Sequence, residues 1–335
     1  MKKKTGVLLV NLGTPDSPSF IDVVKYLFEF LNDPRVIDIP AFFRFLLVNF
    51  IIVPFRSRGS SQIYKEVWTE NGSPLLFHTR DLKDKLQKEL DSEDYEVFFA
   101  MRYKNPSLDA VLEEMQKKNF TKIIMIPLYP QYASASTGSS VERFMKIISK
   151  WWVIPEIEIK GQFFDDPLFI DAVLEPAKKF DIQSYDHIIF SYHGLPERHV
   201  DKVYFDGLCQ HRNCEDELTN ENYFCYKAGS YYTTKLLVEK LGLKEGQYVT
   251  SFQSRLDNKW LTPFTDHELE RLAKEGKKKV LVFCPSFTAD CLETTIEIGS
   301  EYKELFEEKG GEQLDYVESL NSNDSWVKAL KHMII

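Results

Sequence analysis

The imidazole of His193 lies where a reactive side chain is expected. It directly follows the apolar run 186–192 and precedes Gly194 and Pro196, so it stands at a sharp turn. Because an imidazole changes its charge near neutral pH, it can act as a general base or bind a metal ion. The alternative is a structural histidine that hydrogen-bonds a loop carbonyl, and position alone leaves both open.

Four carboxylates follow one another at helical spacing near the C-terminus. They are three, four and four residues apart, which puts them on one face of a helix expected to begin near Thr288. Gly299 in the same segment indicates close approach by another element. The row is either a solvated acidic face or a path for a divalent cation toward a histidine opposite. The four residues are Asp290, Glu293, Glu297 and Glu301.

Aromatic and basic side chains recur beside the ends of the apolar runs. Single aromatic residues mostly belong to a core, but several at one rim suggest a wide, flat, apolar ligand. Arginines could hold the carboxylates of such a ligand through paired hydrogen bonds. The aromatic residues are Tyr64, Tyr103, Tyr129, Tyr132, Trp260 and Phe287, and the arginines are Arg56, Arg58 and Arg102.

Three cysteines lie in a polar segment without clear periodicity, 199–226. Cys209, Cys214 and Cys225 could bind an iron–sulfur cluster or zinc, although a fourth ligand is not obvious. Free cysteines in a loop are the alternative. The chain has five cysteines in all, an odd number that argues against a disulfide framework.

Strands and helices must alternate to position these residues. Apolar runs predict strands at 5–12, 95–101, 121–127, 186–192, 247–251 and 279–284, with weaker candidates at 156–160 and 313–318. Amphipathic patterns predict helices at 77–91, 106–118, 138–150, 167–180 and 228–241. This alternation is typical of an α/β doubly wound fold. Polar, aromatic, glycine and proline residues follow these strands. Because ligands bind beyond the carboxyl ends of such strands, we expect these residues to lie together in one cleft.

Composition excludes several classes of protein. The 335 residues are 43% hydrophobic and 28% charged, which is ordinary for a globular chain of about two domains. A net charge of −9, without a basic cluster interleaved with aromatics, argues against nucleic acid as a partner. Lys2, Lys3 and Lys4 are not followed by a signal-peptide core, so the chain is expected to stay in the cytosol.

One apolar segment bears on membrane contact. Residues 40–55 read PAFFRFLLVNFIIVPF, which is too short to span a bilayer and is interrupted by Arg44 and Asn49. The segment is either a core helix or an apolar lip that contacts a membrane surface or admits an apolar ligand.

The motifs at the strand ends, in this order, resemble those of the ferrochelatase family, the terminal enzymes of haem synthesis. The resemblance covers nearly the whole chain, and SYHGLP followed by WLTPFTD is its most specific part. It rests on LLVNLGTPDSP (8–18), FLNDPRVIDIP (30–40), MRYKNPS (101–107), PLYPQYASASTGSS (127–140), SYHGLPERH (191–199), FQSR and WLTPFTD (252–266), and FTADCLETTIEIGSEY (287–302).

The resemblance implies a fold, a domain division and a reaction. The fold is two Rossmann-like domains, each a four-stranded parallel sheet flanked by helices. The first is expected at 1–155 with an apolar lip at 30–55 and is completed by a C-terminal helix at 320–335. The second, at 156–319, carries the cysteine loop 199–226. The reaction, that of a lyase, inserts Fe²⁺ into protoporphyrin IX and releases two protons.

The resemblance also implies roles for individual residues. His193 would face the ring as proton acceptor or metal-delivering ligand, with Glu293 as the opposed carboxylate. Glu297 and Glu301 would continue a proton or metal path, and Asp290 would lie near its head. Macrocycle or propionate contacts fall on Leu12, Arg56, Tyr64, Arg102, Tyr103, Tyr129, Trp260 and Phe287.

Some positions depart from the family pattern. Cys291 stands where many relatives carry histidine, which puts a histidine-specific metal role there in doubt. The loop of Cys209, Cys214 and Cys225 resembles an insert that binds a [2Fe-2S] cluster in some bacterial members, but the usual fourth cysteine is missing after Cys225.

Several alternatives stay open beside the leading hypothesis. The apolar lip favours protoporphyrin over the four-propionate coproporphyrin, since extra carboxylates should need more basic groups. A haem or metal carrier without insertase activity would share the pocket, and a cobalt chelatase acting on another tetrapyrrole fits the lip poorly. We expect a monomer or homodimer in the cytoplasm, with peripheral contact at the inner face of the membrane.

Overall fold

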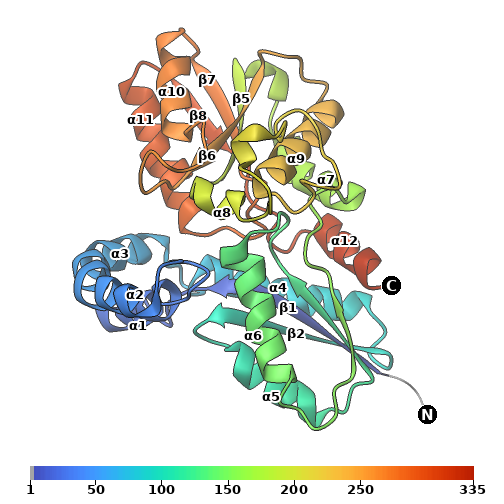
Figure 1. Cartoon of the computed structure of the whole chain (residues 1–335). Helices are drawn as coiled ribbons and strands as arrows, with labels where there is room; N and C mark the ends of the chain where they lie inside the picture. The colour runs from blue at the N-terminus through green and yellow to red at the C-terminus, as the bar shows by residue number, and fades with distance from the viewer. Residues whose placement is uncertain (1–3) are drawn as a thin grey trace. The chain divides into compact units, whose positions relative to one another are not determined.

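Two compact units make up the chain (Figure 1). The structure is a computed structural model that describes residues 4–335, so Lys2 and Lys3 lie outside the described residues. The first unit holds the residues up to Tyr129 together with Ala133–Gln162 and Val327–Ile335, and the second holds Pro130–Tyr132 and Phe163–Trp326.

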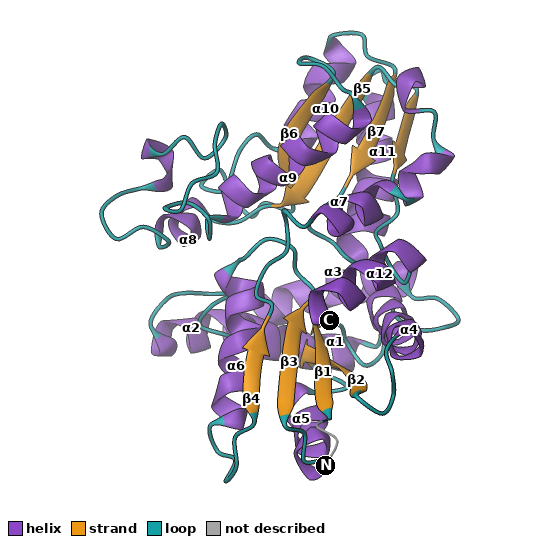
Figure 2. Cartoon of the chain, turned by 90° about the vertical axis from the view of Figure 1, so that its right-hand side faces the viewer, coloured by secondary structure: helices purple, strands orange, loops and turns teal. Residues whose placement is uncertain are grey.

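The first unit is built on a four-stranded parallel sheet in the order β2-β1-β3-β4 (Figure 2). Its strands are β1 (Thr5–Gly13), β2 (Tyr95–Tyr103), β3 (Lys122–Pro127) and β4 (Glu156–Ile159). The consecutive residues Val7, Leu8, Leu9 and Val10 of β1 are all fully buried. Such a run without alternation is expected for an inner strand that is covered on both faces.

Helices follow the strands of the first unit. Ser107 caps the helix after β2, because its hydroxyl accepts a hydrogen bond from the Ala110 amide. The helices are α1 (Phe20–Leu31), α2 (Ala41–Leu47), η1 (Val48–Ile52), α3 (Val53–Val67), α4 (Pro74–Glu89), α5 (Leu108–Lys117), η2 (Ser134–Gly138), α6 (Ser139–Ile148) and most of α12 (Asp324–Ile334). Of these, η1 and η2 are single π-helical turns.

The apolar segment 40–55 is helical but largely exposed. Within it only Val48 and Val53 are buried, whereas Phe42, Phe43, Phe50 and Phe55 are 61–80% exposed. The core-helix interpretation is therefore wrong, and the segment forms an exposed apolar surface on α2, η1 and α3, which we call the lip. No helix among residues 4–335 is long and apolar enough to cross a membrane.

The second unit repeats the same architecture. Its parallel sheet has the order β6-β5-β7-β8. The strands are β5 (His187–His193), β6 (Tyr248–Gln253), β7 (Lys279–Phe283) and β8 (Gln313–Tyr316). The α-helices are α7 (Pro167–Leu174), α8 (Glu197–Asp201), α9 (Tyr226–Leu241), α10 (Thr265–Lys274) and α11 (Lys303–Glu308). Shorter turns are η3 (Pro176–Lys179), η4 (Ile182–Ser184) and η5 (Cys209–His211), and η6 (Glu293–Tyr302) is a π-helix.

The predicted strands and the α/β fold of two Rossmann-like sheets are confirmed. All eight expected strands occur, each with its ends within two residues of the predicted ones. Two helices differ. The α-helix expected at 167–180 ends at Leu174, because Pro176 lacks the amide that would continue it. The helix expected to begin near Thr288 begins at Glu293 and has π geometry, so Asp290 lies outside it.

The division of the chain differs in detail from the boundaries at 155 and 319. β4 pairs with β3 from Glu156 to Ile159, so these residues stay with the first sheet. The first unit regains the chain at Val327, inside α12. The domain boundaries at 155 and 319 stay a prediction from the sequence, and the division into two units is the one that the structure has.

Candidate functional site

His193 is the last residue of β5 and is half-buried. β5 is flanked by β6 and β7, and the register places His193 opposite Gln253, the last residue of β6. The Gly194 amide donates a 2.7 Å hydrogen bond to the Gln253 carbonyl. A Cβ at Gly194 would lie only 2.7 Å from that oxygen and 3.3 Å from the Trp260 ring. The turn after His193 therefore needs glycine, and Trp260 lies beside it.

The imidazole of His193 has a fixed tautomer. Its Nδ1 lies 2.6 Å from the Gly194 carbonyl oxygen, which can only accept a hydrogen bond. Nδ1 therefore carries the proton, and in the neutral ring Nε2 keeps its lone pair. The Phe287 ring, from the loop after β7, lies 6.2 Å from the imidazole between centroids. The arrangement suits a histidine that accepts a proton or binds a metal ion through Nε2.

Gln253 connects the strand end to the acidic helix. Its carbonyl side-chain oxygen accepts a 2.7 Å hydrogen bond from Ser191, and its Nε2 donates to the Glu293 backbone carbonyl at 3.0 Å and to Glu297 at 3.1 Å. The residue is almost fully buried. Sequence reasoning did not single out Gln253. Its position at the end of an apolar run, inside FQSR, was the available signal.

The carboxylate of Glu297 is anchored by several donors. The Ser254 amide donates to Oε1 at 2.7 Å, and the Ser254 hydroxyl donates to Oε2. The Tyr302 hydroxyl donates to Oε1 at 2.9 Å. Burial, followed by the charge of Glu297, raises the pKa of Tyr302, so this phenol stays a donor. As it lies, Glu297 ties η6 to the end of β6.

Glu293 opens the π-helix and is half-buried. The neighbouring Cys291 thiol donates a hydrogen bond to its carboxylate. Burial, and then the negative charge of Glu293, raise the pKa of Cys291 well above its usual value. The thiol is therefore a neutral donor. No strand among the described residues donates a hydrogen bond to the Glu293 carboxylate, although Gln253 of β6 donates to its backbone carbonyl.

Asp290 is a structural carboxylate rather than the first member of a helical row. It is buried, accepts hydrogen bonds from the Ser319 amide at 3.0 Å and the Asn321 side chain at 2.7 Å, and also contacts Thr294. It thus fastens the loop before η6 to the segment after β8. Glu301 lies two turns further along η6 and is exposed. The expected row of four carboxylates on one α-helix is corrected to three, Glu293, Glu297 and Glu301, on a π-helix.

The first unit presents its own set of strand-end residues. Arg102 and Tyr103 are the last two residues of β2, and both side chains reach Asp33. Nη2 of Arg102 lies 2.5 Å and the Tyr103 hydroxyl 3.0 Å from Oδ2. Ser139, at the start of α6, donates to the same oxygen at 2.6 Å. The Arg102 guanidinium also lies 4.4 Å from the centroid of the Tyr103 ring. Asp33 therefore organises this strand end, although the sequence did not identify it.

The remaining predicted ligand contacts of the first unit differ in exposure. Tyr103 is fully buried, so it supports Arg102 rather than offering a free surface. Leu12 near the end of β1 and Tyr129 just after β3 are half-buried. Tyr64 on α3 is half-buried and its ring lies 6.1 Å from that of Tyr26, whereas Arg56 on the same helix is exposed. Gly13 next to Leu12 has φ +112°, and a Cβ there would lie 2.0 Å from the Tyr103 carbonyl oxygen.

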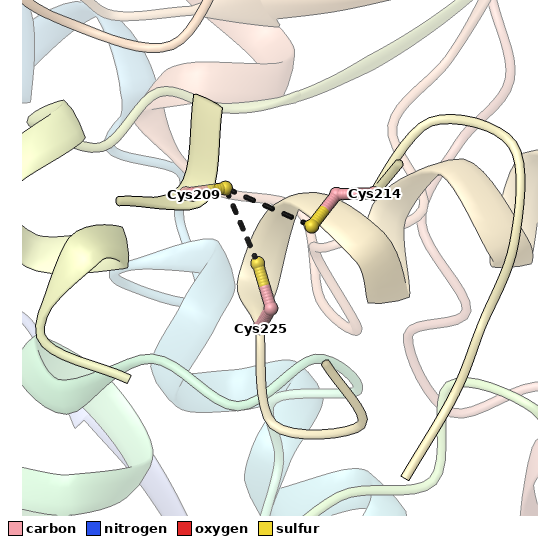
Figure 3. Close-up of side chains that lie close together, drawn as sticks. All are labelled: Cys209, Cys214 and Cys225. Carbon is pink, nitrogen blue, oxygen red and sulfur yellow. Dashed lines mark hydrogen bonds between the residues drawn. The ribbon is translucent and has the colours of Figure 1, made fainter. Parts of the chain in front are cut away.

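The three loop cysteines come together in the second unit (Figure 3). The Cys209 sulfur lies 3.8 Å from that of Cys214 and 3.7 Å from that of Cys225. All three residues are at most 5% exposed. Among residues 4–335, this is the one group of three or more histidine, cysteine or carboxylate residues whose ligand atoms lie close enough to share a metal ion.

Comparison with solved structures supports the fold. SirB from Bacillus subtilis, solved with Fe³⁺, aligns over 99% of this chain and 94% of its own with a TM-score of 0.57. The sequences are 11% identical, so the likeness concerns the fold alone.

Comparison with known sequences identifies the family. The ferrochelatase family model matches residues 4–335. A ferrochelatase of Legionella pneumophila (strain Lens) is 43% identical over 332 residues, which span 99% of this chain and 98% of the relative. One of Coxiella burnetii (strain Dugway 5J108-111) is 39% identical over 336 residues, with 98% and 93% covered. The chain therefore belongs to the ferrochelatase family of lyases.

Proposed function

We propose that this chain inserts Fe²⁺ into protoporphyrin IX, giving protohaem and two protons, as the last step of haem synthesis. The observation that carries the proposal is the His193 geometry, in which Gly194 holds Nδ1 as a donor and leaves Nε2 as an acceptor. A pyrrole N–H is a weak acid, so its proton must pass to a positioned base while the cation replaces it.

The residues of the second unit divide the work in this proposal. His193 Nε2 accepts a pyrrole proton or holds the iron, and Glu293 is the opposed carboxylate. Glu297 and Glu301 continue the acidic face along η6. Because Glu297 already accepts several hydrogen bonds, its contribution is to fix the helix against β6. Trp260 and Phe287 contact the macrocycle beside the imidazole.

The residues of the first unit bind the porphyrin in this proposal. Leu12, Tyr64 and Tyr129 offer partly exposed apolar surface to the macrocycle. Arg56, exposed on α3, pairs with a propionate, and Arg102 does so with its charge partly balanced by Asp33. Tyr103 positions Arg102.

Turnover and binding separate this proposal from a non-catalytic carrier. Purified protein is incubated anaerobically with Fe²⁺, or separately with Zn²⁺, and protoporphyrin, and the porphyrin spectrum is followed. We expect turnover that collapses in His193→Ala while porphyrin binding is largely kept. Porphyrin bound by the wild type without turnover would instead indicate a haem or metal carrier.

A matched pair of carboxylates tests the acidic helix. We expect Glu293→Gln to reduce kcat by at least about tenfold. Losing about 1.4 kcal/mol of transition-state stabilisation has this effect. Glu308→Gln, on the exposed end of α11, is the control and should leave kcat within about twofold. Equal small effects would show that the row is only a solvated acidic face.

The lip supports protoporphyrin as the substrate. Its exposed phenylalanines suit a macrocycle with two propionates, and the Arg44 side chain there already donates to the carbonyls of Ile37 and Ile39. Coproporphyrin, with four propionates, would need more basic groups. We expect kcat/KM to be higher for protoporphyrin, and a higher value for coproporphyrin would contradict the assignment.

The same lip supports peripheral contact with the inner face of a membrane by a cytoplasmic protein. An exposed apolar patch of this kind is typical of membrane or ligand contact. Flotation with phosphatidylcholine vesicles should be reduced when Phe42, Phe43 and Phe55 are replaced by serine. A monomer or homodimer, and a [2Fe-2S] cluster at Cys209, Cys214 and Cys225, remain predictions from the sequence.

A further inference from the structure

The loop that joins α8 to α9 has almost no apolar core. Of residues 201–225, all described, only Cys209, Cys214, Asn222 and Cys225 are buried. Phe205 is fully exposed and Phe224 is 55% exposed. Apart from the short η5 turn and ring contacts of Tyr223 and Phe224, the segment has little that would hold it, and hydrophobic burial contributes little to its order. The side chains of Cys209, Cys214 and Cys225 bring different parts of the segment together (Figure 3).

The spacing of the sulfurs matches one tetrahedral ion. With a metal–sulfur distance of about 2.3 Å, thiolates on a single tetrahedral ion are about 3.8 Å apart. The Cys209 sulfur lies 3.8 and 3.7 Å from its two neighbours, and all three sulfurs lie within 4.8 Å of one another.

A [2Fe-2S] cluster fits these residues less well. It takes two thiolates on each iron, and thiolates on different irons lie more than about 5 Å apart. The chain offers three thiols here, because Cys284 lies at the end of β7 in the core and Cys291 lies beside Glu293. The group therefore lacks both the fourth thiol and the wider spacing.

A phenol oxygen lies beside two of the three sulfurs. The Tyr204 hydroxyl lies 3.1 Å from the Cys214 sulfur and is also within hydrogen-bonding reach of Cys225. Asn222 Nδ2 lies 3.9 Å from the Cys214 sulfur and can donate to a thiolate there. The Arg212 guanidinium, which is ion-paired with Asp206 and Glu221, lies 5.1 Å from the centroid of the Tyr204 ring. Cys225 also precedes α9, whose N-terminus favours negative charge.

We propose that Cys209, Cys214 and Cys225 bind one Zn²⁺ ion as thiolates, with the Tyr204 oxygen as fourth ligand. The ion is structural and joins three parts of the chain: the end of α8, the η5 turn and the start of α9. The first of these is reached through the Cys209 amide, which donates to Asp201 at 2.8 Å.

The zinc site also steadies the loop around His193. Tyr226, next to Cys225, opens α9, and its hydroxyl is hydrogen-bonded to Ser286 and to the His193 backbone. The Ser286 hydroxyl in turn accepts from the His193 amide at 3.2 Å. Zinc at Cys225 thereby fixes the first turn of α9 against the strand end that carries the imidazole.

Metal content tests the proposal directly. Protein with His193→Ala, which removes the substrate-metal ligand, is purified and its zinc, iron and acid-labile sulfide are measured. We expect one zinc per chain and no sulfide. Cys214→Ser in the same background should lose that zinc, while Cys284→Ala, which removes a buried thiol elsewhere, should keep it. Two irons with two sulfides per chain, or zinc retained in Cys214→Ser, would overturn the proposal.

Two further measurements do not depend on how the cysteine variant folds. Modifying the thiols of the unaltered chain with a mercurial should release one zinc to a chromophoric chelator as three thiols react. Zinc release without thiol modification would contradict the site. A chain mass that is two hydrogens lower, which indicates a disulfide, would contradict it as well. With Co²⁺ in place of zinc, Tyr204→Phe should shift the visible d–d bands, and unchanged bands would remove Tyr204 from the ligand set.

The structural role has its own readout. In the zinc-loaded chain, protease should cleave slowly within 202–224, and removal of zinc should speed cleavage there at least tenfold. The segment 254–259, an exposed loop without cysteines, is the internal control and should be cleaved at an unchanged rate. Equal cleavage of 202–224 with and without zinc would show that the ion does not hold the loop.

Discussion

At the scale of single residues, Gln253 connects the end of β5 to η6 within the second unit. Its side-chain oxygen accepts a hydrogen bond from the Ser191 hydroxyl. Its Nε2 donates to the Glu293 backbone carbonyl and to the Glu297 carboxylate. A buried amide that satisfies several partners leaves each of them unpaired when it is removed, at about 1–3 kcal/mol per group. Gln253 is thus a positioning residue, which acts through His193 and η6.

Replacing Gln253 by leucine should affect catalysis more than substrate binding. We expect kcat to fall by about tenfold with KM nearly unchanged, because the η6 carboxylates shift while the porphyrin surface stays intact. Steady-state kinetics measure both values. Gln116→Leu, on the exposed face of α5, is the control. A rise in KM alone would show that Gln253 serves substrate binding instead.

His187 makes stability depend on pH. It is buried at the start of β5, and neither ring nitrogen has a hydrogen-bond partner among the described residues. Burial, aided by the charges of Arg271 and Lys277, lowers its pKa from 6.5 to about 4. The unfolded chain therefore takes up this proton at a higher pH than the folded chain does. The free energy of unfolding falls as pH drops from about 6.5 to 4, by up to about 3 kcal/mol.

Substitution of His187 tests this dependence. Urea unfolding of His187→Leu between pH 7 and pH 4.5 should show a shallower loss of stability than the wild type. Above pH 7 the histidine contributes no slope, so the two curves should run parallel there. His332→Leu removes an exposed imidazole and serves as control. An unchanged slope in His187→Leu would mean that another group carries the acid sensitivity.

At the scale of elements, η6 explains why the acidic residues could be found and their setting could not. The spacing of Glu293, Glu297 and Glu301 fits an α-helix and a π-helix alike, because both place residues four apart on one side. The π geometry comes from hydrogen bonds five residues apart and leaves no mark in the hydrophobic pattern. Asp290 was wrongly predicted to belong to the helical row for a related reason. Its tertiary partners Ser319 and Asn321 are distant in sequence.

The strands were predictable because their cause is local. Both sheets are covered on both faces, so their inner strands read as continuous apolar runs. Histidine at the end of β5 and the glycine after it also marked the turn that carries the imidazole. Asp33 and Gln253 carry no such signal, because a buried polar residue is defined by its partners. Gly299 lies between these cases: the sequence indicated a close approach, and Tyr316 of β8 confirms it.

Alanine at Gly299 should be destabilising because of that approach. A Cβ there would lie 2.9 Å from the Tyr316 ring, so η6 or β8 must shift. We expect a loss of about 1–3 kcal/mol in the free energy of unfolding, as for other overpacked sites. In Gly59→Ala on α3 the new Cβ meets nothing within 4 Å, and stability should rise by about 0.5–1 kcal/mol. Equal effects of the two substitutions would contradict the close packing of η6 on β8.

At the scale of the whole molecule, the C-terminus returns to the unit in which the chain began. Val327–Ile335 belong to the first unit, although Phe163–Trp326 before them form the second. Within α12, Ala329 and Leu330 are fully buried, and Lys331 lies 3.2 Å from Glu89 of α4. The resemblance to a known family implied a C-terminal helix at 320–335 in the first domain, whereas the local sequence of α12 shows only an amphipathic helix.

Leu330 is therefore expected to stabilise the first unit, most of which is distant from it in sequence. Leu330→Ala should lower the free energy of unfolding by about 2–5 kcal/mol, because it leaves a cavity in a closed core. Amide hydrogen exchange should accelerate in β1 to β4 and stay nearly unchanged in β5 to β8. Ile335→Ala, at a side chain that is 74% exposed, should change stability by no more than about 0.5 kcal/mol. If exchange accelerated mainly in β5 to β8, the C-terminal helix would instead stabilise the second unit.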